Sequence, residues 1–85
     1  MTPHRAARLT FAMPHEGRAT LEVFDLQGRL VRKLFDGPAM AGENEVTWDG
    51  TDVSARRVAG GIYFYRLSAL DAQISKKIVV AAGLR

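Results

Sequence analysis

The feature that most constrains the fold is the segment from Ala19 to Arg32, in which two runs of alternating apolar and polar residues flank a short turn. Alternation with period two is typical of a half-buried β-strand, because successive side chains of a strand point to opposite faces. The turn is Asp25-Leu26-Gln27-Gly28, and its glycine can adopt a positive φ angle without steric cost. The segment therefore predicts a β-hairpin.

The two strands of this hairpin are predicted at residues 18–25 and 29–35, and further strands at residues 8–13, 43–48, 62–69 and 73–81. A very short additional edge strand is expected around Val58. A β-bulge is expected within 29–35, because no single alternation collects its four apolar side chains on one face. Residues 36–42 are expected to form a loop, since they contain two glycines and a proline. No segment has helical periodicity of useful length.

The alternation also predicts which side chains form the core. Two antiparallel sheets packed face to face would bury the aromatic and aliphatic residues that share the inward side of their strands. These are Leu21, Val23, Val46, Trp48, Tyr63, Tyr65 and Leu67, with Ile74, Ile78 and Val80 expected inward on the last strand. The fold class is therefore all-β, a small antiparallel β-sandwich, with an open barrel as the alternative.

Composition excludes several classes of protein. A chain of 85 residues has room for one small domain, and it contains no cysteine that could form a disulfide or a thiolate metal site. The net charge is +3, and the twelve basic residues are scattered along the chain, so no nucleic-acid partner is expected. The sequence has no apolar run long enough to insert into a membrane and no recognisable signal peptide.

The turn from Trp48 to Asp52 is the most site-like cluster. Asp49 and Asp52 could supply oxygen ligands to a calcium ion, but two carboxylates fall short of the six to eight oxygens that calcium prefers. The alternative is that both side chains accept hydrogen bonds from backbone N–H groups of the turn, while Trp48 anchors the core. No metal or other cofactor is therefore predicted.

Neither catalysis nor sugar binding is strongly indicated. The histidines His4 and His15 lie in a terminal segment and a turn, without the spacing of a zinc site or a nucleophilic triad, so the chain is predicted not to be an enzyme. Tyr63, Phe64 and Tyr65 could form an aromatic platform for sugar rings. Strand alternation argues against it, because Phe64 would point away from the two tyrosines.

Four motifs occur in order along the chain, at Leu21–Leu34, Ala41–Asp52, Gly60–Leu67 and Lys76–Val80. With them, the sequence resembles the immunoglobulin-like module of the flagellar hook-capping protein and the type A C-terminal sorting domains of the type IX secretion system. The resemblance implies an immunoglobulin-like β-sandwich of six to seven strands. It also implies a single module over residues 1–85, with its core at 8–81, at the C-terminus of a longer parent protein.

The function that this resemblance implies is a non-catalytic sorting or anchoring module, which directs a bacterial passenger protein to the cell surface. Its partners would be the secretion machinery or the parent passenger domain, its location extracellular or at the cell surface, and its export signal outside this chain. Lys76, Lys77 and Arg85 are the candidate partner-recognition residues. One alternative is a self-associating, homo-oligomeric subunit of an extracellular or hook-cap-like flagellar assembly, and another is a carbohydrate-binding module.

Overall fold

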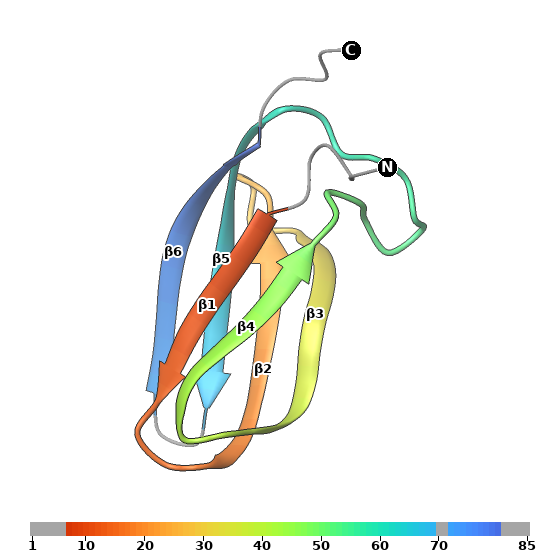
Figure 1. The fold of residues 1–85 in the computed structure, drawn as a ribbon. Coiled ribbons are helices and arrows are strands. Elements are labelled where there is room, and N and C mark those ends of the chain that lie inside the picture. The colour runs from red at the N-terminus through yellow and green to blue at the C-terminus, as the bar shows by residue number, and fades with distance from the viewer. Residues whose placement is uncertain (1–6, 70–71, 81–85) are drawn as a thin grey trace.

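The computed structural model describes residues 7–69 and 72–80, and this part of the chain contains β-strands and no helix (Figure 1). The strands are β1 (Ala7–Met13), β2 (Gly17–Phe24), β3 (Leu30–Ala39), β4 (Gly42–Trp48), β5 (Gly61–Ala69) and β6 (Ala72–Val80). The all-β fold class is confirmed. No helix in the described ranges is of the length and hydropathy needed to cross a membrane.

The strands form two antiparallel sheets that face each other. β1 pairs with β4 in a two-stranded sheet, and the other sheet has the order β3-β2-β5-β6. In Figure 1 the small sheet lies across the front of the large one. This arrangement confirms a sandwich of six strands and excludes the open barrel.

The predicted hairpin joins β2 to β3. Its ends are held by the hydrogen bonds from the Gly28 N–H to the Asp25 carbonyl (2.9 Å) and from the Asp25 N–H to the Arg29 carbonyl (3.0 Å). Gly28 has a φ of 84°, in the left-handed region that side chains with a Cβ disfavour. The glycine is therefore what allows the turn to be this tight.

The prediction of a loop over residues 36–42 is wrong. β3 continues to Ala39, Pro38 pairs with Arg18, and only Met40 and Ala41 separate it from β4. β3 is an edge strand, and an edge position tolerates a proline because the missing N–H need not meet a neighbouring strand. The expected bulge is present, since the β2–β3 register shifts at two points.

The short strand expected around Val58 is also wrong. The described loop between β4 and β5 has one isolated bridge, which pairs Thr51 with Arg57. The Val58 N–H donates instead to the Gly50 carbonyl at 2.9 Å, so this residue closes a local turn rather than extending a sheet. Between the strands predicted at residues 62–69 and 73–81, residues 70 and 71 lie outside the described part of the chain, which resumes at Ala72, the first residue of β6.

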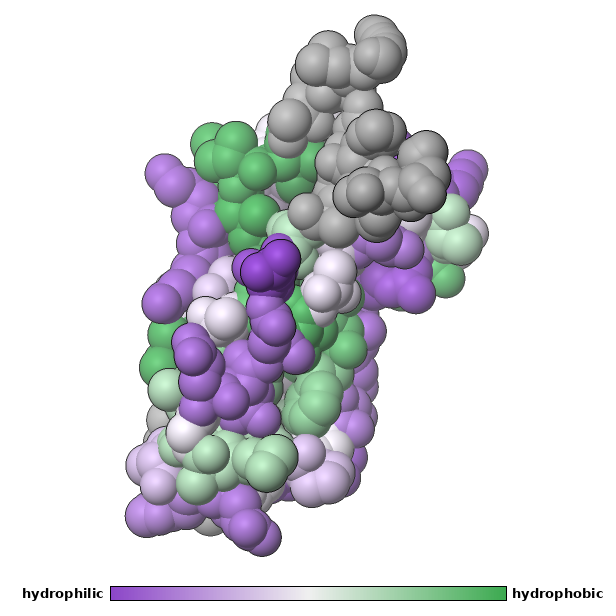
Figure 2. All heavy atoms as spheres, viewed as in Figure 1, coloured by the Kyte–Doolittle hydropathy of each residue, from purple (hydrophilic) through white to green (hydrophobic). Residues whose placement is uncertain are grey.

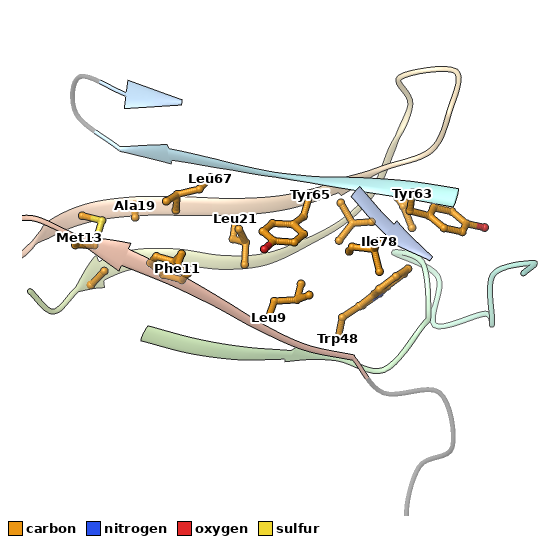
Figure 3. Packing of buried hydrophobic residues seen from close by; sticks show 13 residues of the cluster. Leu9, Phe11, Met13, Ala19, Leu21, Trp48, Tyr63, Tyr65, Leu67 and Ile78 are labelled. Carbon is orange, nitrogen blue, oxygen red and sulfur yellow. The ribbon is translucent and has the colours of Figure 1, made fainter. Parts of the chain in front are cut away.

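The core lies between the two sheets and is built from alternate residues of each strand (Figure 3). The largest side chains that are almost fully buried are Trp48, Leu21 and Val23, and Tyr63, Tyr65 and Leu67 of β5 are buried with them. The Trp48 and Tyr63 rings meet edge to face, with centroids 5.7 Å apart. Val46 packs against this cluster but is only partly buried.

The inward assignment of the last strand is only partly right. Ile78 is buried and Val80 packs against the core, but the Ile74 side chain is 51% exposed. Its β5 partner, Leu67, is buried. A sheet of two strands cannot cover one of four, so the first half of β6 extends past the cover that the small sheet provides.

Candidate functional site

The loop between β4 and β5 carries Asp49 and Asp52, and both side chains hold the loop itself. Asp49 Oδ1 accepts hydrogen bonds from the Thr51 N–H (3.1 Å) and the Thr51 hydroxyl (2.6 Å). Asp52 Oδ1 accepts from the N–H groups of Ser54 (2.8 Å) and Arg56 (3.0 Å). Two backbone N–H groups on one carboxylate oxygen are typical of a turn cap.

These hydrogen bonds stabilise the charged form of each carboxylate. The Thr51 hydroxyl holds the pKa of Asp49 below its ordinary value, and the Arg56 N–H does the same for Asp52. Among the described residues, no group of three or more histidine, cysteine, aspartate or glutamate side chains could hold a metal ion. The geometry therefore favours the turn-cap interpretation of these two aspartates over a calcium site.

Arg32 of β3 contacts the same loop, a connection that the sequence pattern did not predict. Its Nη1 donates to the Asp52 carbonyl at 2.6 Å and to the Thr51 hydroxyl at 3.1 Å. The Trp48 indole N–H donates to the Thr51 carbonyl at 2.9 Å. The loop is thus tied both to the large sheet and to the core.

Two of the shallow grooves on the described surface bring side chains of different strands together. A groove of about 230 Å³ is lined by Arg32, Lys33, Leu34, Thr47 and Asp49. A second, of about 260 Å³, is lined by Arg18, Ala19, Thr20, Ser68 and Ala69. Neither of these two linings brings a histidine or a second carboxylate to a hydroxyl, an arrangement typical of acid–base or nucleophilic catalysis. His15 is exposed in the turn after β1, and His4 lies outside the described residues.

The aromatic residues of β5 do not form one platform. Tyr63 and Tyr65 are buried in the core, while Phe64 faces the other side of the sheet beside Phe24. The Tyr63 hydroxyl donates to the Ala59 carbonyl at 2.6 Å, and burial raises the pKa of this hydroxyl. Next to Phe64, the Arg66 guanidinium lies 4.5 Å from the centre of the Phe24 ring. Sugar binding by stacking on these rings has no support in this arrangement.

The candidate recognition residues lie on β6. Lys76 pairs with Tyr65 and Lys77 with Phe64 across the β5–β6 ladder, and both lysines are exposed. Because neighbouring residues of a strand alternate, the two ammonium groups leave the strand on opposite faces. Arg85, the third candidate, lies outside the described residues.

Comparison with known proteins places this geometry in a family. The family model for the FlgD Ig-like domain matches residues 5–73 of the chain. Among solved structures, the crystal structure of FlgD from P. aeruginosa matches with a TM-score of 0.74 and 20% sequence identity, over 96% of this chain and 67% of that chain. No curated protein gives a significant match.

The structural match, at this level of identity, supports the fold, whereas the family model matches the sequence over most of its length. The two agree with the immunoglobulin-like sandwich that the four sequence motifs implied. They favour the hook-capping branch of that resemblance and give no support to a type IX sorting signal. The chain belongs to the FlgD Ig-like domain family, the immunoglobulin-like family of the flagellar hook-capping protein.

Proposed function

We propose that this chain is a non-catalytic, protein-binding structural module of a hook-cap-like assembly outside the cell. The family match over residues 5–73 is the observation that carries this proposal. It favours the structural alternative over the sorting or anchoring function that the sequence first suggested.

The distribution of polar contacts supports a role in binding rather than chemistry. The aspartates of the β2–β3 turn and of the β4–β5 loop are engaged in holding those turns. The surface offers sheet faces and sheet edges, which are the elements that small β-domains use to bind other proteins. The partner of this module is therefore a protein, either another component of the assembly or a second copy of the chain.

The module is part of a longer protein in this proposal, with residues 1–85 as one domain and its core at 8–81. The match covers 67% of the FlgD chain, so that protein extends beyond the region that resembles this domain. A module of this kind would position its parent within the assembly through contacts between folded surfaces.

The test is to find where the parent protein is located in its native cell. An epitope tag on the chromosomal copy should place the protein in purified hook structures, and deletion of residues 7–80 should prevent hook completion. As a control for expression, an immunoblot should show that the cell contains as much of the shortened protein as of the full-length protein. Normal hooks in the deletion strain would contradict the proposal.

A reporter fusion separates this function from sorting. A secreted reporter fused to residues 3–85 should not reach the cell surface more than the same reporter fused to residues 3–75, which lacks Lys76, Lys77 and Arg85. Surface display that depends on these last residues would restore the sorting function and contradict the structural one.

A further inference from the structure

β6 is the most regular free edge of the large sheet. It pairs with β5 over nine residues without a register shift, and it contains neither proline nor glycine. The opposite edge, β3, has two register shifts and contains Gly37 and Pro38. Within residues 7–69 and 72–80, no strand pairs with the outer side of β6.

A free antiparallel edge presents hydrogen-bonding groups at every second residue, because alternate N–H and C=O groups point away from the neighbouring strand. Proline, bulges, short length and charged side chains, lysine above all, are the usual means of blocking such an edge. β3 has a proline, two register shifts and Lys33, whereas β6 has only its two lysines, Lys76 and Lys77. The backbone of β6 is therefore free to accept one more strand, provided that this strand compensates the charge of the lysines.

We propose that β6 binds an extended acidic segment of a partner protein as an additional antiparallel strand, with two adjacent carboxylates opposite Lys76 and Lys77. This inference rests on the proposed role as a protein-binding module and names the chemistry of its partner.

The charges on β6 select the partner. Lys76 and Lys77 stand beside Tyr65 and Phe64 of β5, which carry no negative charge, and neither lysine is in an ion pair with another described residue. The β6 strand of a second copy, paired antiparallel about its centre, would place lysine against lysine, and such like-charge pairs are destabilising. An acidic strand removes this repulsion and neutralises both faces.

Exposed apolar residues flank the two lysines on β6. Ile74 is 51% exposed and Val79 is 69% exposed. Figure 2 shows hydrophobic residues at the upper left, where Figure 1 places the C-terminal end of β6. An added strand would cover these side chains with its own, and the backbone bonds would supply affinity independent of sequence.

The register of β6 specifies the order of residue types in the partner. Read from the partner's N-terminus, the segment has two apolar residues opposite Val79 and Ile78, then two acidic residues opposite Lys77 and Lys76. A polar residue opposite Ser75 and an apolar residue opposite Ile74 complete it. Thr-Val-Val-Glu-Asp-Thr-Val-Thr satisfies this order and can be made as a blocked synthetic peptide.

The experiment is an NMR titration of the full 85-residue chain, labelled with nitrogen-15, with this peptide. We expect the largest amide shift changes in β6 and slower hydrogen exchange at alternate β6 residues. A peptide with two lysines in place of Glu-Asp should bind at least about tenfold more weakly. Shift changes confined to β1, β3 or β4, or equal binding of both peptides, would overturn the proposal.

Charge reversal on the protein provides the reciprocal test. The double variant Lys76→Glu/Lys77→Glu should prefer the lysine peptide, while the matched variant Arg56→Glu/Arg57→Glu, another adjacent and exposed basic pair, should retain the original preference. Far-UV circular dichroism checks that both variants are folded. An unchanged preference in the Lys76→Glu/Lys77→Glu protein would contradict the assignment of these lysines.

Backbone pairing is tested on the peptide alone, so that the protein is not altered. N-methylation of alternate peptide amides should abolish binding in one of the two possible series and leave it intact in the other. Equal effects of the two series would exclude strand addition. Slow exchange, in the free chain, of the β6 amides that point away from β5 would also exclude it, since the outer edge would then already be covered.

The results separate this inference from the proposed function. A tagged parent protein found in hooks, together with a peptide that leaves β6 unchanged, would retain the structural role and remove the β6 edge as its means of binding. Peptide binding at β6, in a protein absent from hooks, would retain the β6 edge as a binding site and remove the hook-cap role.

Discussion

At the scale of single residues, aspartates stabilise the turns of this domain. Asp25 Oδ1 accepts hydrogen bonds from the N–H groups of Gln27 and Arg29, each at 2.9 Å, and its other oxygen pairs with the Arg29 side chain. Asp52 repeats the two backbone hydrogen bonds in the β4–β5 loop, and Asp49 accepts from the N–H and the hydroxyl of Thr51. The sequence indicated turn caps at these last two positions, whereas the Arg32 contact depends on a neighbour nineteen and more positions away.

These three aspartates predict acid sensitivity. Hydrogen bonds to the charged carboxylates, from the Arg29 and Arg56 N–H groups and the Thr51 hydroxyl, hold each pKa below the ordinary value of 3.8 in the folded chain. Each group therefore contributes stability above its unfolded pKa that is lost as the pH falls through its folded pKa. We expect the urea midpoint to fall between about pH 5 and about pH 2.

The aspartate contribution is isolated by substitution. In Asp25→Asn/Asp49→Asn/Asp52→Asn, the acid-dependent fall of the urea midpoint should be smaller than in the parent chain. Glu16→Gln is the matched control, because this exposed carboxylate has no hydrogen bond or ion pair with another described residue. An equal fall in the triple variant and the parent would show that these caps do not control acid stability.

The two buried tyrosines predict a second single-residue effect. Tyr63→Phe removes the 2.6 Å hydrogen bond to the Ala59 carbonyl and should lower the free energy of unfolding by about 1 kcal/mol. Tyr65 is equally buried, but its hydroxyl forms no hydrogen bond within the described residues, so Tyr65→Phe should change stability little. Urea denaturation measures both, and equal losses would contradict the assigned role of the Tyr63 hydroxyl.

At the scale of elements, the hairpin between β2 and β3 depends on backbone conformation at its turn. Gly28 has a φ of 84°, and a Cβ added there would meet nothing within 4 Å. The demand for glycine is therefore conformational and not a matter of space. Ala55, in the β4–β5 loop, adopts a φ of 65° and carries the strain that Gly28 avoids.

Substitutions at the two positions should differ in their effect on stability. Gly28→Ala should destabilise the domain by about 1–2 kcal/mol, because alanine disfavours the left-handed region. Ala55→Gly should be neutral or stabilise it by up to about 1 kcal/mol. The glycine relieves the backbone strain, but it also makes the unfolded chain more flexible, which offsets part of the gain. Thermal denaturation measures both changes.

Gly17 supplies the matched control for the hairpin. A Cβ at Gly17 would also meet nothing within 4 Å, but this residue begins β2 and does not have a positive φ. Gly17→Ala should therefore leave the stability close to that of the parent chain. A loss as large as that of Gly28→Ala would mean that side-chain bulk, rather than backbone conformation, is what these positions exclude.

At the scale of the whole molecule, the two sheets share one core and should unfold together. Phe11 of β1 is buried, and its ring centre lies 5.9 Å from that of Phe35 in the facing sheet. Trp48 lies in the small sheet and contacts Tyr63 in the large one. Neither sheet retains a buried face without the other.

The resulting prediction is one cooperative transition. Trp48 fluorescence and far-UV circular dichroism should give the same urea midpoint, and Phe11→Ala should shift both by an amount equivalent to about 3–5 kcal/mol. Separate midpoints, or a shift in fluorescence alone, would show that the small sheet unfolds before the large one.

The sequence alone determined the features that depend on local geometry. Alternation of apolar and polar residues predicted the strands, the inward side of β5 and the two-layer sandwich, because side-chain direction in a strand follows from position along the chain. The β2–β3 turn was predictable for the same reason, since the conformational freedom of Gly28 is a property of that residue.

Only the tertiary structure decided which of these positions are covered. Ile74 has the inward parity of Ile78 but stays half exposed, and Pro38 is accommodated in a strand, because coverage and edge position depend on strand order in the two sheets. The sequence makes Lys76 and Lys77 neighbours along the last strand. Their position on a free edge follows from the order β3-β2-β5-β6, which local pattern does not encode.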